Sequence, residues 1–213
     1  MSKLFYIYGC IGSSKTLRLL ATAYNFEEKN IPFICLKPSK DTRDGVNVIK
    51  SRAGLERECR TINEDDNVFQ IVETFNKICM ADFSTGLRWI LIDECQFLTV
   101  DQVNQLSDIV DILNVNVMCY GLRTDFTTEA FPAAKRLFEI ADSIEEVKTS
   151  CECGKTATVN ARIDKNGMLA TKGEQVQVGG NDMYKALCRR CWKKHINIQK
   201  QIINEDSSQK EKL

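Results

Sequence analysis

The chain has 213 residues, long enough to bury a full core, and its length favours one main domain with a smaller appendage. Its 29 basic and 29 acidic residues give a net charge of +0, so composition supplies no general attraction to nucleic acid or to an anionic membrane. No apolar run approaches the roughly 20 residues that span a bilayer, and the N-terminus lacks a signal-peptide pattern. We therefore expect a soluble, cytoplasmic protein with a small charged substrate.

A phosphate-loop pattern opens the chain. A short apolar run breaks into the loop Gly9–Ser14, which ends in Lys15 and Thr16 just before a helical pattern. In such a loop, backbone N–H groups cradle nucleotide phosphates, the Lys adds charge and the Thr hydroxyl reaches Mg²⁺. The usual pattern has Gly directly before the Lys, whereas this chain has Ser14 there and Gly12 earlier. Taken alone, the stretch also fits an ordinary strand-to-helix turn.

Alternating strand and helix patterns follow the loop. Apolar spacing predicts a helix from Lys15 to about Lys29 and a buried strand at Ile31–Leu36, before an exposed loop at 41–45. Residues 51–66 are charged and lack a clear period, so we expect them to be mobile. Further helices are expected at 68–80, 103–113 and 131–140, and further apolar strands at 89–98 and 115–122. This order predicts an α/β fold: a P-loop parallel sheet flanked by helices, of the RecA-like kind.

Two adjacent carboxylates, Asp93 and Glu94, end the apolar run that begins at Trp89. In open α/β sheets, ligands collect at the carboxyl ends of the strands, where a carboxylate can hold the Mg²⁺ of a bound nucleotide. If Asp93 serves the metal, Glu94 is free to accept a proton from an attacking hydroxyl, which makes phosphoryl transfer the reaction to test. The alternative is two solvated acids at a strand end.

Ten cysteines fall into two groups. Six are scattered, mostly in apolar segments, and should behave as small buried hydrophobic residues. The other four form a CxC pair and a CxxC pair near the C-terminus: Cys151, Cys153, Cys188 and Cys191. Close pairs suit a structural zinc ion held by four thiolates, although a disulfide or four unrelated thiols would also fit. His195 should be an exposed residue, since four thiolates already complete a site.

The sequence changes character after residue 150. Alternating apolar residues flank an Asn166-Gly167 turn signal, and a second alternation involves Val176 and Val178. A helix is expected at Tyr184–Ile203, followed by a polar, frayed tail. We therefore divide the chain into a nucleotide-binding domain at 1–146, a zinc-binding domain at 147–195 and a polar tail at 196–213.

Several motifs occur together in one order: the phosphate loop, Asp-Thr-Arg, Ser-Arg-Ala-Gly-Leu, Asp-Glu-Cys-Gln-Phe-Leu, Tyr-Gly-Leu-Arg-Thr-Asp-Phe, Val-Gly-Gly and Cys-Arg-Arg-Cys. With this set, the chain resembles the type II thymidine kinase family, and most closely its bacterial and phage branch. The resemblance covers nearly the whole chain except the tail.

The resemblance implies transfer of the γ-phosphate of ATP to the 5′-hydroxyl of thymidine, and of deoxyuridine, with Mg²⁺ and a structural Zn²⁺. It implies that Glu94 is the catalytic base, that Arg43 stabilises charge on the transferring phosphate, and that Phe126 stacks on thymine. It places Tyr184 in a lasso-like loop of the zinc domain that covers the nucleoside. The residues that it places around ATP and its metal are Gly9, Cys10, Ile11, Gly12, Ser13, Ser14, Lys15, Thr16, Asp93, Glu94, Cys95 and Gln96.

The same resemblance implies a homotetramer that is inhibited by the end product dTTP, with no nucleic-acid or membrane partner. Two positions depart from the family pattern. Ser14 replaces a Gly, which would cost about 1 kcal/mol if the backbone there is left-handed. Cys191 stands where close bacterial relatives often have His, and both are good zinc ligands.

Two other classes of protein share some of these features. A nucleic-acid-stimulated ATPase could combine a phosphate loop with a zinc knuckle, although polymer binding calls for a basic footprint that a net charge of +0 does not supply. A non-catalytic relative weakened at Ser14 would show no thermal stabilisation by ATP or dTTP.

Overall fold

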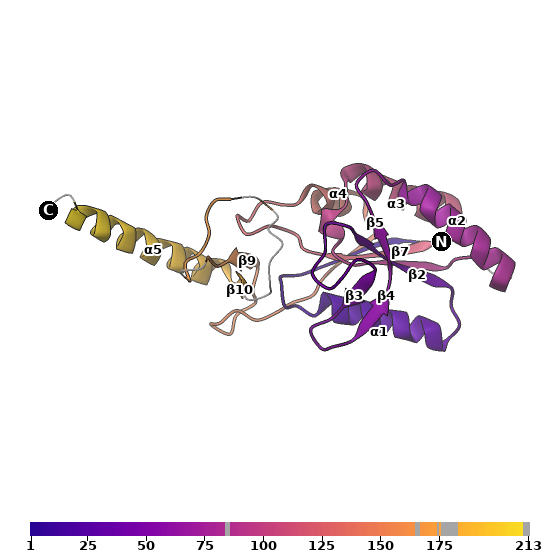
Figure 1. Cartoon of the computed structure of the whole chain (residues 1–213), viewed down its shortest axis with the longest axis horizontal. Coiled ribbons are helices and arrows are strands. Elements are labelled where there is room, and N and C mark those ends of the chain that lie inside the picture. Colours follow the sequence, from indigo (N-terminus) through magenta and orange to yellow (C-terminus); the bar gives the residue numbers. More distant parts are fainter. Residues whose placement is uncertain (84–85, 165–166, 174, 176–182, 211–213) are drawn as a thin grey trace.

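A six-stranded sheet forms the core of the larger, N-terminal part of the protein in the computed structural model (Figure 1). The structure describes residues 1–83, 86–164, 167–173, 175 and 183–210. The strand order is β5-β2-β6-β7-β1-β8, and all five neighbouring pairs are parallel. The strands are β1 (Leu4–Tyr8), β2 (Phe33–Pro38), β5 (Arg60–Ile62), β6 (Trp89–Ile92), β7 (Asn116–Gly121) and β8 (Ser143–Glu146). This confirms the expected parallel sheet.

Helices cover both faces of the sheet (Figure 1). One face packs on α1 (Lys15–Glu28), and the other packs on α2 (Val68–Phe83), α3 (Val100–Leu113) and α4 (Pro132–Ile140). The alternation of strand side chains divides the core: Tyr6 of β1 joins the cluster under α2 to α4, and the adjacent Ile7 joins the cluster under α1. Two buried faces explain why the strands read as apolar runs rather than as alternating patterns.

The helix boundaries follow local signals. Apolar spacing places each of the four helices to within a few residues. The start of α3 is fixed by Thr99, whose hydroxyl accepts a hydrogen bond from the Gln102 N–H while the Gln102 side chain accepts one from the Thr99 N–H. Pro132 begins α4, because proline needs no N–H partner at the first helical position.

A short hairpin packs against α1, and the residues between its two strands line the pocket described below. It consists of β3 (Val48–Lys50) and β4 (Glu56–Glu58), which pair antiparallel. Ile49 is 2% exposed and anchors the hairpin in the core beneath α1. Residues 51–66 therefore contain two short strands, β4 and β5, where the sequence shows no clear period.

The C-terminal part forms a second, smaller sheet. β9 (Val159–Arg162) pairs antiparallel with β10 (Tyr184–Leu187), and α5 (Arg189–Lys210) projects away from the rest of the molecule (Figure 1). The expected helix at Tyr184–Ile203 is wrong at its start, because Tyr184 to Leu187 form a strand against β9. The helix also continues to Lys210, through much of the segment that was expected to fray.

The predicted Asn166-Gly167 turn falls partly outside the described residues. On either side of it, Ile163 and Leu169 form an antiparallel bridge, as a hairpin there requires. The predicted alternation at Val176 and Val178 lies wholly outside the described residues. In the parts of the chain that the structure describes, no helix is both long enough and apolar enough to cross a membrane.

Candidate active site

The phosphate loop connects β1 to α1 at the carboxyl edge of the sheet. Ser14 is the residue before α1 and has φ 62° and ψ 25°, and Gly12 has φ 76°. Ser14 is thus in the left-handed conformation, which glycine adopts without cost and other residues do not. This explains why the usual residue at this position is Gly. The Ser14 side chain makes no capping hydrogen bond to the helix. The departure from the family pattern therefore carries a backbone strain that no capping hydrogen bond of the Ser14 side chain offsets.

Ser14→Gly should raise the free energy of unfolding by about 0.5–1 kcal/mol, because relief of a left-handed non-glycine backbone outweighs the extra flexibility of Gly in the unfolded chain. Urea or thermal unfolding measures the change. Ser39→Gly is the control, since Ser39 is not among the residues with positive φ. An equal or lower stability of Ser14→Gly would contradict the strain argument.

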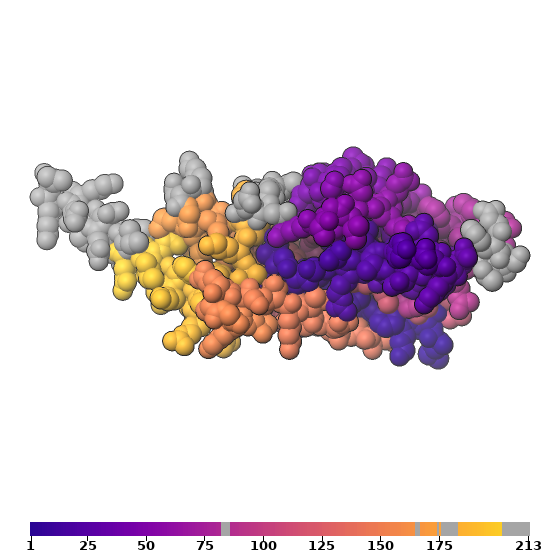
Figure 2. All heavy atoms as spheres, turned by 90° about the horizontal axis from the view of Figure 1, so that it is seen from below, coloured from indigo at the N-terminus to yellow at the C-terminus, as the bar shows by residue number. Residues whose placement is uncertain are grey.

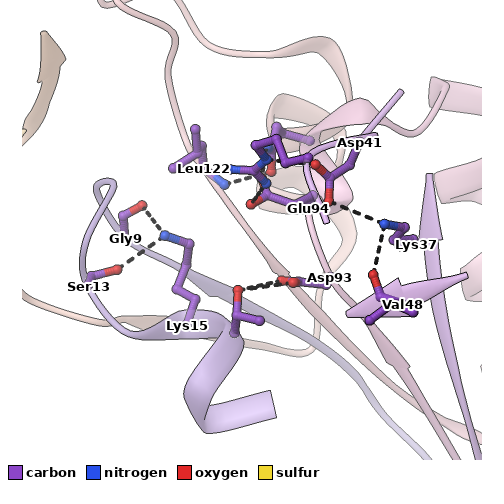
Figure 3. A network of polar contacts seen from close by, with 12 residues as sticks. Gly9, Ser13, Lys15, Lys37, Asp41, Val48, Asp93, Glu94 and Leu122 are labelled. Atoms are coloured by element: carbon purple, nitrogen blue, oxygen red, sulfur yellow. Dashed lines mark hydrogen bonds and ion pairs between the residues drawn. The ribbon is translucent and has the colours of Figure 1, made fainter. Parts of the chain in front are cut away.

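The Lys15 side chain folds back over the loop. Its Nζ donates hydrogen bonds to Gly9 O at 3.1 Å and to Ser13 Oγ at 3.2 Å (Figure 3). It also donates to Cys10 O at 3.0 Å. Burial lowers the pKa of Lys15, and the nearby carboxylates of the site partly offset this. Phosphate oxygens would offer the ammonium group charged acceptors in place of these neutral ones.

Thr16 and Asp93 meet at the carboxyl edge, although they belong to segments that follow β1 and β6. Thr16 Oγ1 donates to Asp93 Oδ2 at 3.0 Å (Figure 3), which joins the two strands across the intervening β7. Burial and the charge of Glu94 raise the pKa of Asp93 to about 7, against the effects of Thr16 and Lys15. A hydroxyl and a carboxylate side by side are the hard oxygen donors that Mg²⁺ prefers, so the pair fits a metal site.

Glu94 lies at a sharp turn after β6. It has φ 49° and ψ 39°, and a short 3₁₀ helix, η1 (Cys95–Phe97), follows it. Its carboxylate accepts hydrogen bonds from Arg43 Nη2 and from Gln96 Nε2, the latter at 2.5 Å. Burial alone would raise the pKa of Glu94, but Arg43 and Lys15 more than offset it, and the pKa lies below its usual value. Glu94 is therefore ionised, and Arg43 covers one of its oxygens.

A chain of charged side chains positions Arg43. Arg43 Nε donates to Asp41 Oδ1 at 2.7 Å, and Lys37 Nζ lies 3.8 Å from Asp41 Oδ2. Lys37 is 1% exposed and donates to the Val48 carbonyl at 2.9 Å (Figure 3) and to the Gly45 carbonyl at 2.7 Å. Sequence reasoning missed Lys37, although a lysine inside an apolar strand run is itself a signal of a buried charge that needs partners.

These residues surround one pocket of about 650 Å³. Eight of the predicted nucleotide residues line it, and Arg43 and Arg52 line it as well. The eight are Ile11, Gly12, Ser13, Ser14, Lys15, Thr16, Asp93 and Glu94. Among the described residues, the other four predicted ones do not line the pocket but contact or adjoin residues that do. The carbonyls of Gly9 and Cys10 accept hydrogen bonds from Lys15, Gln96 donates one to Glu94, and Cys95 is fully buried.

Phe126 and Tyr184 are not among the described residues that line this pocket. Phe126 is 1% exposed, and the Arg162 guanidinium lies 3.6 Å from the centre of its ring. One ring face is therefore covered by a cation, and a base can reach the ring only after neighbouring side chains move. Tyr184 is paired with Arg162 across β9 and β10, next to residues 176–182, which lie outside the described part of the chain.

The four clustered cysteines come together as predicted. Their Sγ atoms all lie within 4.8 Å of one another, and those of Cys153 and Cys188 are 3.7 Å apart. That spacing is too long for a disulfide, whereas thiolates at about 2.3 Å from a tetrahedral zinc are about 3.8 Å apart. The cluster therefore fits zinc. His195 is 44% exposed and bonds Glu152 at 2.7 Å, outside the cluster, as expected.

The other six cysteines behave as small hydrophobic residues. Four of them are buried, Cys59 and Cys79 are half-buried, and none of these six is in a disulfide. Five of them pack in the core of the main domain, whereas Cys10 packs in the same apolar cluster as Cys151 and Cys188 without belonging to the group of four Sγ atoms. The structure gives the two groups the different roles that their spacing indicates.

The phosphate loop on a parallel sheet, the carboxylates after β6 and the pocket between them define a P-loop protein of the nucleotide-binding α/β class, with a cysteine cluster beside it. A family model described as thymidine kinase matches residues 2–192. The chain belongs to the thymidine kinase family.

Curated relatives match over nearly their whole length. A thymidine kinase of Mannheimia succiniciproducens is 41% identical over 189 residues, which are 89% of this chain and 94% of the relative. A thymidine kinase of Aliivibrio fischeri is 38% identical over 92% of this chain and 99% of the relative. The Pif1 helicase structure from Candida albicans is 15% identical over 68% of this chain and 36% of that chain, with a TM-score of 0.41, which is too low to support a conclusion.

Proposed function

We propose that this protein transfers the γ-phosphate of ATP to the 5′-hydroxyl of thymidine, and of deoxyuridine, to give the nucleoside monophosphate and ADP. The observation that carries the proposal is the convergence of Lys15, the Thr16–Asp93 pair and Glu94 on one pocket, in a chain of the thymidine kinase family. A cation, a metal-binding pair of oxygens and a carboxylate are the groups that phosphoryl transfer needs.

In this reaction, Glu94 accepts the proton of the 5′-hydroxyl as the oxygen forms its bond to the γ-phosphorus. The bond from that phosphorus to the bridging oxygen breaks, and ADP leaves with the electron pair. Thr16 and Asp93 would hold Mg²⁺, which supplies charge neutralisation at the β- and γ-phosphates. Lys15 exchanges the loop carbonyls for phosphate oxygens, and Arg43 turns from Glu94 to the transferring phosphate.

The clustered cysteines support a structural role for zinc. With four thiolate ligands the metal would have no open position, so it would join the segment after β8 to the start of α5. The segment between Cys153 and Cys188 contains Arg162, which packs on the ring of Phe126, and the proposed lasso with Tyr184. We propose that this lasso covers the nucleoside and excludes water. A homotetramer, inhibition by dTTP and a cytoplasmic location belong to the same proposal and rest on the family.

The proposal is tested by incubating the purified protein with ATP, Mg²⁺ and a panel of nucleosides. We expect dTMP from thymidine and dUMP from deoxyuridine, with little product from purine nucleosides. The same assay with DNA in place of nucleoside tests the ATPase alternative. ATP consumption stimulated by DNA and not by thymidine would overturn the proposal, as would the absence of any thermal stabilisation by ATP or dTTP.

A further inference from the structure

The small domain reaches into the phosphate loop through one buried side chain, that of Asn160. Asn160 lies in β9 and is 3% exposed. Its Oδ1 accepts a hydrogen bond from the Ile11 N–H at 2.8 Å, and its Nδ2 donates to Thr124 O at 2.8 Å. One carboxamide thus joins three segments: the phosphate loop, the segment after β7 and the small domain.

Two further contacts join the same surfaces. Thr149 Oγ1 donates to Gly12 O at 3.4 Å. The Cys10 side chain belongs to the apolar cluster of the small domain, together with Cys151, Leu187 and other buried residues. In Figure 2 the orange and yellow spheres of the small domain lie directly against the indigo spheres of the N-terminal segment. The phosphate loop is therefore packed on the small domain as well as on its own sheet.

These contacts matter because a phosphate loop binds through the orientation of its peptide groups. Lys15 holds the carbonyls of Gly9 and Cys10, but it has to release them when it turns to phosphate. The bonds of Asn160 to Ile11 and of Thr149 to Gly12 do not involve Lys15, and Asn160 and Thr149 are not among the described residues that line the pocket, so these bonds can persist in the nucleotide complex. Together with the backbone bonds from the Gly9 N–H to Gly121 O and from the Ser13 N–H to Cys10 O, they can hold the first half of the loop.

We propose that Asn160 is a positioning residue through which the small domain sets the affinity of the phosphate loop for nucleotide. The inference deepens the proposed function, because it assumes that the loop binds a nucleotide. It goes beyond a covering role for the small domain: the contact acts on the nucleotide side of the pocket, and it does so before any nucleoside is bound.

The test is binding of a non-hydrolysable ATP analogue with Mg²⁺, measured by calorimetry without nucleoside. Asn160→Leu keeps a similar volume and removes both hydrogen bonds. We expect binding about tenfold weaker than in the parent, with a matching rise in KM for ATP and kcat within about threefold. Thr149→Val, which deletes one hydroxyl at the surface and puts folding at little risk, should weaken binding by about threefold.

Leu169→Ala is the control, since Leu169 packs in the same apolar cluster but makes no bond to the loop. It should lower the melting temperature and leave nucleotide affinity unchanged below that temperature. Parent-like affinity in both Asn160→Leu and Thr149→Val would overturn the inference and leave the proposed function standing. So would equal weakening by Leu169→Ala. Failure of the parent protein to bind the analogue would overturn both.

Discussion

Replacing Glu94 by Gln should lower kcat by about 100-fold to 10,000-fold, the usual contribution of a general base, and should leave nucleotide affinity near that of the parent. Gln keeps the size of the side chain but cannot take the proton of the 5′-hydroxyl. The amide oxygen of the variant can accept from Arg43 or from Gln96 but not from both, so one donor has to turn away, as Arg43 is proposed to do when ATP binds. Steady-state rates with thymidine, together with titration of an ATP analogue, measure the two effects separately.

The matched control is Glu73→Gln, which makes the same chemical change on α2. Glu73 pairs with Lys77 on the same helix and does not line the pocket. Its kcat should equal that of the parent. A Glu94→Gln protein with parental turnover would remove Glu94 from the chemistry. Loss of nucleotide binding in that variant would show that Glu94 shapes the pocket instead.

The second large effect is expected for Cys188→Ser. Cys188 is buried in the cysteine cluster, and its loss leaves three thiolates. Zinc sites of this kind contribute on the order of 10 kcal/mol to the folding of small metal-binding domains. We expect zinc content to fall from about one ion per chain to near zero, the small domain to unfold at a lower temperature, and thymidine phosphorylation to be lost. Metal analysis and thermal unfolding measure the first two.

Cys59→Ala serves as the control for this experiment. Cys59 is a half-buried thiol in the main domain, packed against the core under α1. Its replacement should cost some stability and leave zinc content unchanged. Full zinc content in Cys188→Ser would contradict the four-thiolate site, and a disulfide between clustered cysteines in the purified protein would do the same.

Most of the fold could be predicted because its signals are local. The apolar runs of β1, β6 and β7 and the helical spacing of α1 to α4 reflect burial on both faces of one sheet. The start of α5 could not be placed from spacing alone. Residues Tyr184 to Leu187 form a strand because β9 offers them hydrogen-bond partners, which is a tertiary effect that overrides a helical pattern.

The residues of the candidate site also fall into those that local sequence signals reveal and those that depend on long-range contacts. Lys15, Thr16, Asp93 and Glu94 could be found because adjacent residues in one motif stay adjacent in space. The contacts of Asn160 with Ile11 and Thr124 join residues 149 and 36 positions apart, so no motif contains them. The one local signal in the sequence is that Asn160 is a polar residue between the apolar residues Val159 and Ala161 of β9. The cover of Phe126 by Arg162 has the same long-range origin.

The bond between Arg43 and Glu94 has a consequence for the idle enzyme. While the guanidinium neutralises that carboxylate, a stray water in the pocket finds no group ready to deprotonate it. Glu94 becomes available as a base only when a bound triphosphate draws Arg43 away from it. Arg43 therefore neutralises Glu94 only while the pocket holds no nucleotide, and once ATP is bound the exclusion of water has to come from the proposed lasso over the nucleoside.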